Sequence, residues 1–194
     1  MANSASAYHG LLLAEVHESD LSKAIRHLRK QGFLAAGTKA SATGLGGNSG
    51  GVLAGLLSHL TFWFDPPSWA PKGVRMAGWD WQVVLVRVRL TTLAVFVCYF
   101  TSGYPGDVNT TKFRQILETK NILGLPSILI GDFNATPQEI ADLGWPRLWR
   151  GHVLLPPVEF TCTIGSCRMI DFAICSESLR GNASLLPDPN SPWA

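Results

Sequence analysis

Apolar residues fall into short runs separated by polar turns, a pattern that predicts an α/β protein. Strands are expected at residues 11–14, 52–54, 84–89, 93–100, 127–130 and 169–175. Valines alternate with leucine and arginine in 84–89, and Thr91-Thr92 lead into the next β-rich run. These two segments are therefore expected to form an antiparallel pair.

Helices are expected in three of the intervening segments. The first follows Ser19-Asp20, where apolar residues recur with helical spacing and the basic residues lie mostly on the opposite, solvated face. The second begins near Asn109 or Thr110 and ends before Gly124. Thr136-Pro137-Gln138-Glu139 is a capping box with proline at the first helical position, so a short third helix starts there.

The run from Ser127 to Ile130 ends abruptly in Gly131-Asp132-Phe133-Asn134. Such a run predicts a buried strand that delivers polar groups at its carboxyl end. In α/β proteins ligands and chemistry collect at that edge of the sheet. The pair Asp132 and Asn134 is therefore the first candidate for a functional site.

Other conspicuous segments carry weaker signals. The glycine-rich stretch 44–51 matches neither a Walker loop nor the dinucleotide fingerprint, so a flexible turn is expected. Segment 62–81 is rich in aromatic residues and proline, which predicts a long loop; its rings allow base stacking, but packing beneath the loop is commoner. Cys162 and Cys167 lack a second ligand pair for zinc, and free thiols are expected.

Composition narrows the class of protein. The 194 residues, 46% hydrophobic and 15% charged, suit one domain over 1–194 with a sizeable core. The net charge of +2 neither requires nor excludes a nucleic-acid partner. Arg87 and Arg89 interrupt the longest apolar segment, so no membrane span is expected. The first thirteen residues lack a basic signal-peptide region, which predicts an intracellular location.

Three carboxylates share one sequence context. Glu15, Asp132 and Asp171 each lie in or at the end of a strand-like apolar run, so converging strand ends would bring them together. Clustered carboxylates repel one another, and oxygen-rich clusters suit Mg²⁺ or Mn²⁺. A metal-dependent phosphoester reaction is the chemistry that this arrangement predicts, with Asn134 and Tyr99 as neutral donors to phosphoryl oxygens.

These residues resemble the endonuclease/exonuclease/phosphatase superfamily over nearly the whole chain. Leu13-Ala14-Glu15 is similar to the family's strand-end Gln-Glu motif, with alanine replacing glutamine, and Val97-Cys98-Tyr99 to its strand ending in tyrosine. Gly131–Asn134 matches Gly-Asp-Phe-Asn, and Ile170-Asp171-Phe172 resembles Ile-Asp-Tyr/Phe. The pair Gly50-Gly51 resembles the glycines that open a central strand, and all five elements occur in family order.

The resemblance implies a four-layer α/β sandwich of two packed mixed sheets flanked by helices, with one cleft at an edge. It also implies that Glu15 is a metal ligand and that Asp132 activates or positions water. Asn134 would hold the scissile phosphate, and Tyr99 would stabilise the oxyanion. Asp171 would orient a histidine near the carboxyl terminus.

The chain departs from the family pattern at both ends. No histidine follows His152, so the closing Ser-Asp-His motif is missing, and Asn3 is too close to Glu15 to match the asparagine of the family's first strand. We therefore expect an incomplete domain that lacks the first and last strands. Exposed sheet edges would leave such a chain marginally stable.

Three functions remain open at this point. The first is a magnesium-dependent phosphodiesterase with a nucleic-acid substrate, similar to retrotransposon or abasic-site endonucleases. The second is a phosphatase or phospholipase acting on inositol phosphates or sphingolipids. The third is a catalytically inactive fragment of such a domain, which the missing histidine favours because loss of one phosphate-binding group costs roughly 3 kcal/mol or more.

Overall fold

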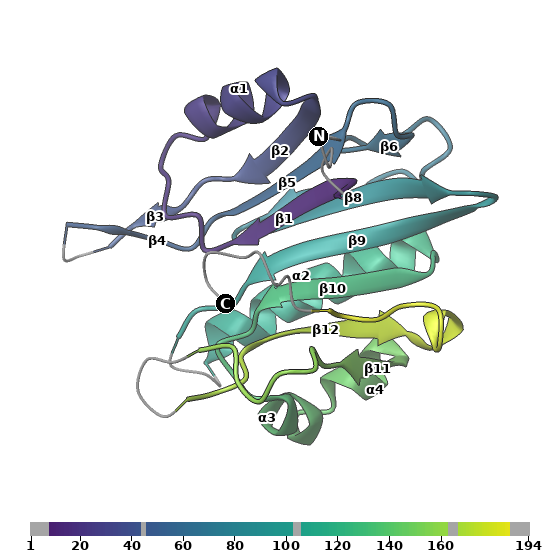
Figure 1. Cartoon of the computed structure of the whole chain (residues 1–194). Coiled ribbons are helices and arrows are strands. Elements are labelled where there is room, and N and C mark those ends of the chain that lie inside the picture. Colours follow the sequence, from purple (N-terminus) through teal and green to yellow (C-terminus); the bar gives the residue numbers. More distant parts are fainter. Residues whose placement is uncertain (1–7, 44–45, 103–105, 163–166, 187–194) are drawn as a thin grey trace, which may run out of the picture.

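The computed structural model describes residues 8–43, 46–102, 106–162 and 167–186 (Figure 1). Residues 1–7 and 187–194 lie outside the described part. The structure therefore does not test whether Asn3 fails to match the family's asparagine, or whether the first and last strands are missing. Both stay predictions. The described residues form an α/β fold with packed sheets flanked by helices, as predicted.

The larger sheet has seven strands in the order β11-β12-β10-β9-β8-β6, and β7 also pairs with β8. It is mixed, because β9 and β10 run parallel while the other described pairs are antiparallel. Its strands are β6 (Phe62–Trp63), β7 (Ala77–Gly78), β8 (Trp81–Val88), β9 (Thr91–Tyr99), β10 (Ser127–Asp132), β11 (Gly151–Leu154) and β12 (Asp171–Ser176).

The smaller sheet has the order β1-β5-β2, with antiparallel pairs, and a separate two-stranded ribbon joins β3 to β4. These strands are β1 (Gly10–Ala14), β2 (Phe33–Thr38), β3 (Ser41–Ala42), β4 (Asn48–Ser49) and β5 (Val52–Leu57). Figure 1 shows β1 facing β9 and β10 of the larger sheet, so that the end of β1 reaches the same edge as the ends of β9 and β10.

Four α-helices and one 3₁₀ turn complete the described chain, and α1 packs against β2 on the smaller sheet. They are α1 (Ser22–Lys30), α2 (Asp107–Leu123), α3 (Pro137–Asp142), α4 (Trp145–Trp149) and η1 (Glu177–Leu179). The capping box predicted at Thr136 is present, since its hydroxyl accepts from the Glu139 N–H while the Glu139 carboxylate accepts from the Thr136 N–H.

The main core lies between the larger sheet and helices α2, α3 and α4. Aromatic rings fill much of it: Phe113 stacks on Trp145 with centroids 4.0 Å apart, and Phe133 stacks on Phe172 at 4.1 Å. Trp149 is fully buried there. Residues 145–149, for which the sequence alone favours a packed surface loop, are packed but form helix α4.

The second core lies between the two sheets. Alternate residues of one strand serve the two cores, as in β9, where Phe96 and Cys98 face the helices while Val97 and Tyr99 face the smaller sheet. Both faces are thus covered along the buried parts of β8 and β9, which explains why these parts are apolar runs rather than strict alternations. The face of the sheet that carries Tyr99 therefore looks into the space between the sheets.

Two expectations about strands need correction. Asp171 was expected inside a strand that starts at Met169, but β12 begins at Asp171, so the carboxylate lies at the strand end. The aromatic segment 62–81 is not one loop, since it contains β6 and β7, and Trp81 is a fully buried residue of β8. Only some of its rings stay exposed, chiefly Trp69 and Trp79.

Among the described helices, none is both long and apolar enough to cross a membrane.

The aromatic core predicts a large difference between two sites on α2. Phe113→Ala removes a ring that is 1% exposed and stacked on Trp145, so it should lower the free energy of unfolding by about 3–5 kcal/mol. Val108→Ala, at a position 45% exposed, should change it by less than about 0.5 kcal/mol. Urea unfolding followed by far-UV circular dichroism measures both. Equal losses would contradict this description of the core.

Candidate active site

Sheet register brings three of the predicted site residues into one row. Asp132 at the end of β10 pairs with Tyr99 on parallel β9 and with Asp171 on antiparallel β12. Directly opposed residues on neighbouring strands carry their side chains on the same face of a sheet. Tyr99, Asp132 and Asp171 therefore point together toward the space between the sheets.

Gly131 makes this row possible. Its φ of +154° is one that side-chain-bearing residues rarely adopt, and a Cβ built there would lie 1.9 Å from the Cys98 carbonyl oxygen. The glycine of the Gly131–Asn134 motif thus lets β10 approach β9 closely one residue before Asp132 and Tyr99 pair. Any other residue would push these two strand ends apart.

The turn after β10 fixes Asp132 and Asn134 against each other. The Asn134 N–H donates to Asp132 Oδ1 at 2.7 Å, and Asn134 Nδ2 donates to the Phe100 carbonyl at 2.8 Å and to Asp132 Oδ2 at 3.2 Å. The hydrogen bond from the Asn134 N–H to Asp132 Oδ1 forms an Asx turn, and it also fixes the two candidate site residues relative to each other. The amide nitrogen is already engaged, so binding a phosphate through Nδ2 would require it to release Asp132.

Glu15 reaches the row from the other sheet. It follows β1 directly with a φ of +55°, and its carboxylate lies 3.6 Å from His17 Nε2. His17 in turn contacts the Asn48 carbonyl through Nδ1 at 2.9 Å. His17 was given no role from the sequence; its position two residues after Glu15 was the only signal, and a lone histidine gives no metal-ligand spacing.

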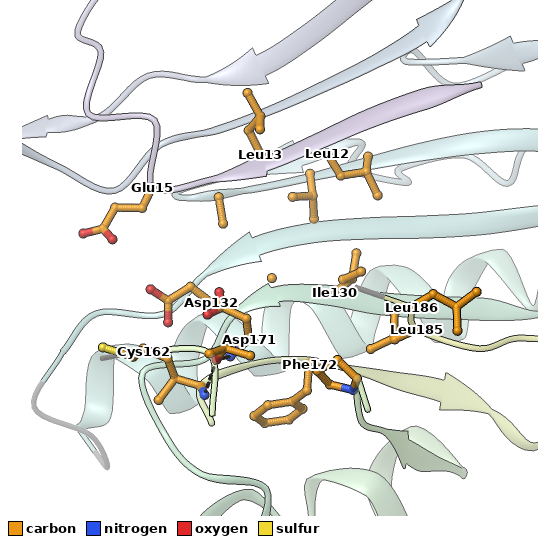
Figure 2. Close-up of a pocket in the computed structure, with 16 residues that line it drawn as sticks. Leu12, Leu13, Glu15, Ile130, Asp132, Cys162, Asp171, Phe172, Leu185 and Leu186 are labelled. Atoms are coloured by element: carbon orange, nitrogen blue, oxygen red, sulfur yellow. Dashed lines mark hydrogen bonds between the residues drawn. The ribbon is translucent and has the colours of Figure 1, made fainter. Parts of the chain in front are cut away.

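A hollow of about 890 Å³ lies between β1 on one side and β10 and β12 on the other (Figure 2). Figure 2 shows Glu15 on one wall with Asp132 and Asp171 on the opposite wall. The rest of the lining is mainly apolar and includes Leu12, Ile130, Leu185 and Leu186. The cleft therefore has an acidic end and an apolar end.

Burial and like charge perturb the acids at this end. Loss of solvation raises the pKa of Asp132 to about 7, and the neighbouring Asp171 and Glu15 carboxylates add to the rise against the opposing Asn134 hydrogen bond. The pKa of Asp171 is also raised, mainly by desolvation, although part of its side chain reaches solvent. The three carboxylates thus form one electrostatic cluster.

Asp171 is held by Thr161, whose hydroxyl accepts from the Ile170 and Asp171 N–H groups at 3.0 and 2.9 Å. From its position in the sequence alone, Asp171 could pair with Arg168 or Ser166 as a structural contact. Arg168 instead pairs with Glu139 on α3, and Ser166 lies outside the described residues. Thr161 carried no sequence signal, because it is ten residues away from Asp171 and matches no motif.

The Tyr99 hydroxyl lies 3.3 Å from Ser49 Oγ on β4. Burial raises the pKa of Tyr99, and the nearby Glu15 and Asp132 carboxylates act in the same direction against the Ser49 hydrogen bond. The phenol therefore stays protonated at neutral pH and remains a hydrogen-bond donor. This state suits the oxyanion role implied for it.

A buried ion pair anchors Tyr99 from behind. Lys112 Nζ on α2 donates to Asp80 Oδ2 at 3.0 Å and to the Tyr99 carbonyl at 2.6 Å, and both charged side chains are at most 3% exposed. Asp80 Oδ1 accepts from the Gly51 N–H at 2.7 Å, and the Asp80 carbonyl accepts from the Tyr99 N–H at 2.9 Å. The pair ties the end of β9 to α2 and to the start of β5.

The donor set fits a hard divalent cation chemically, since it consists of carboxylate oxygens with surplus negative charge. Within the described residues, however, no three His, Cys, Asp or Glu side chains are close enough to hold one metal ion together. Mg²⁺ is commonly held by one or two carboxylates and several waters. The described residues are therefore compatible with Glu15 as a single protein ligand, but not with a site in which three or more such side chains coordinate the ion.

Comparison with solved structures establishes the fold. The endonuclease domain of TRAS1, a telomere-specific non-LTR retrotransposon, matches with a TM-score of 0.56 and 18% identity over 89% of this chain and 86% of that one. The 3′ phosphatase NExo from Neisseria, bound to a product DNA hairpin, matches at 0.54 and 13% over 89% and 78%. The human Nocturnin catalytic domain, with bound sulfate, matches at 0.60 and 12% over 87% and 69%.

The chain thus has the fold of the endonuclease/exonuclease/phosphatase superfamily, as its sequence motifs implied. No protein-family model matches the sequence, and a search of curated proteins finds no match either. At these identities the structural matches define an architecture, and the roles of individual residues depend on the geometry described above.

The raised pKa of Asp132 predicts that the free energy of unfolding falls as the pH rises. An aspartate in an unfolded chain ionises near pH 4, whereas Asp132 in the folded chain holds its proton until about pH 7. Between about pH 4 and pH 7 the folded state therefore binds more protons than the unfolded state. The contribution of Asp132 to stability is greatest below pH 4 and is lost as the pH rises through 7. A difference of one in pKa between the folded and unfolded states corresponds to about 1.4 kcal/mol.

Thermal melts in chelator between pH 5 and 8 measure this loss. Asp132→Asn should flatten the decline, while Asp142→Asn on the exposed side of α3 should leave it unchanged. A decline of the same slope in Asp132→Asn would show that other groups cause it.

The Lys112–Asp80 pair predicts strongly non-additive substitutions. Asp80→Asn or Lys112→Met alone leaves a buried charge without its partner and should cost about 3–5 kcal/mol. The double variant should cost clearly less than the sum of the two. Urea unfolding tests this, with Glu177→Gln in an exposed ion pair as a control that leaves the midpoint unchanged. Additive losses would contradict direct coupling.

Proposed function

We propose that this chain is a divalent-metal-dependent phosphodiester hydrolase that acts on nucleic acid as an endonuclease. The observation that carries the proposal is the convergence of Glu15, Asp132 and Asp171 with Tyr99 at one end of the cleft between the sheets. Clustered acids with raised pKa values are typical of functional sites. The fold supports the same class, because the matched structures include nucleases and phosphatases.

Each residue has a role in this proposal that follows from its contacts. Asp132, with a pKa near 7, accepts the proton of the attacking water at neutral pH. Tyr99 remains protonated and donates to the developing oxyanion. Asn134 holds the phosphate once its amide leaves Asp132, and Asp171 keeps the local charge negative beside the base.

Glu15 would hold the cation. Mg²⁺ or Mn²⁺ bound there would supply positive charge to the phosphate and offset the repulsion among the acids. The Glu15 side chain is 37% exposed, so the ion would keep several of its waters. His17 beside it would have to yield its contact with Glu15 when the ion binds.

Nucleic acid is favoured as the substrate by two considerations. The NExo structure contains a product DNA hairpin, and the TRAS1 structure is an endonuclease domain. The half-exposed ring of Trp79 also offers a surface on which a base can stack.

A second candidate is hydrolysis of a phospholipid, such as a sphingolipid. The observation that favours it is the apolar end of the cleft, where Leu12, Leu185 and Leu186 line the hollow that the carboxylates share. Leu186 is 78% exposed. An amphiphilic substrate would place its phosphate against the acids and its acyl chains against these leucines.

Plasmid nicking with Mg²⁺ tests the leading proposal. The wild-type chain should nick supercoiled DNA. Asp132→Ala should reduce the nicking rate by about two orders of magnitude or more. Glu15→Gln should raise the Mg²⁺ concentration that gives the half-maximal rate. Glu18→Gln, an exposed acid three residues away, is the matched control and should keep the wild-type rate.

Three results would separate the alternatives. Release of headgroup from sphingolipid vesicles without nicking would favour the second candidate. No activity on either DNA or lipid would support the third possibility, an inactive domain. Nicking that survives Asp132→Ala would contradict the active-site assignment.

A further inference from the structure

A second hollow, of about 280 Å³, lies beside helix α2 and is separate from the carboxylate cleft. Its lining comprises Trp79, Asp107, Val108, Thr111, Lys112 and Gln115. Pockets for drug-sized ligands typically measure about 300–1,000 Å³, so this one suits a single planar ring system. Trp79 belongs to the aromatic segment 62–81, and none of the proposed catalytic roles uses an exposed ring of that segment.

Trp79 is an exposed ring held in a fixed position. Its side chain is 50% exposed, yet Nε1 donates to Ser41 Oγ at 3.1 Å and the Lys112 ammonium lies 4.8 Å from the ring centroid. These two contacts anchor the indole to the β3–β4 ribbon and to α2. A ring that is both exposed and immobilised offers a stacking surface at low entropic cost.

The charges around the hollow select a neutral ligand. Lys112 is paired with Asp80, so its ammonium is not free to bind a phosphate, and the Asp107 carboxylate at the rim repels one. Thr111 and Gln115 add neutral donors and acceptors. An aromatic face beside neutral polar groups suits a nucleobase better than a phosphate or an acyl chain.

The hollow lies close to the proposed catalytic residues. The Lys112 ammonium lies 5.7 Å from the Tyr99 ring as well as 4.8 Å from the Trp79 ring, so the two rings flank one group. Ser41, which holds Trp79, pairs in β3–β4 with Ser49, which contacts the Tyr99 hydroxyl. A strand bound at Tyr99 therefore has this hollow within reach of a nearby base.

We propose that the Trp79 hollow is a subsite that stacks one unpaired base of the nucleic-acid strand bound in the cleft. The inference rests on the proposed function for the identity of the strand, but it concerns binding rather than hydrolysis. It assigns the enzyme a preference for single-stranded or frayed DNA, because a base inside a duplex cannot reach the ring.

Fluorescence anisotropy with a labelled single-stranded oligonucleotide, in chelator so that no hydrolysis occurs, tests the subsite. Trp79→Ala should weaken binding by roughly 5- to 100-fold, the effect of losing one stacked base. Trp79→Phe keeps an aromatic ring but loses the Ser41 hydrogen bond, and should retain most of the affinity. An oligonucleotide of the same length with abasic sites should bind wild type weakly and show little further loss with Trp79→Ala.

Trp69→Ala is the matched control. Trp69 is 49% exposed, almost the same as Trp79, but it packs edge-on against Trp63 and does not line the hollow. It should bind the oligonucleotide as wild type does. Equal losses in the Trp69 and Trp79 variants, no loss in either, or no binding by wild type would overturn the proposal.

The two proposals fail separately. Binding that depends on Trp79 in a chain that never nicks DNA would retain the subsite and refute the endonuclease. Nicking with unchanged KM and affinity in Trp79→Ala would retain the endonuclease and refute the subsite.

Discussion

The constraint on which the site depends is the pairing of Asp132 with Tyr99 on one side and Asp171 on the other. Strand pairing forces two carboxylates next to each other in a partly desolvated cleft, and the packing of the second sheet brings Glu15 toward them. Repulsion and burial oppose this arrangement, so the rest of the sheet must stabilise it. The raised pKa of Asp132 follows directly from the free-energy cost of ionising a buried carboxylate beside other carboxylates.

The structure supports this row from two directions. Gly131 lets β10 approach β9 without a Cβ in the way, which fixes the register next to the site. Behind Tyr99, the buried Lys112–Asp80 pair holds the end of β9 against α2 and the start of β5. Gly131 lines the cleft, whereas Lys112 and Asp80 do not. Together they keep the acid row rigid, as a preorganised site requires.

Much of this could be predicted from sequence because the signals are local. Gly131–Asn134 ends an apolar run, Thr136–Glu139 is a capping box, and each predicted strand has its own apolar pattern. The contacts that were missed are long-range: Thr161 beneath Asp171, Ser49 against Tyr99, and the Lys112–Asp80 pair. No spacing rule connects residues that meet only after the sheets have packed. Asp171 was misplaced within its strand because an apolar run does not mark the residue at which pairing begins.

The central claim is that Glu15, Asp132 and Asp171 form one coupled acidic cluster. Carbon-detected NMR titration of the Asp132 carboxyl in metal-free protein tests it most directly. We expect a pKa near 7 that moves downward in Asp171→Asn and in Glu15→Gln. A pKa near the ordinary value of about 4, or one that neither substitution changes, would contradict the claim.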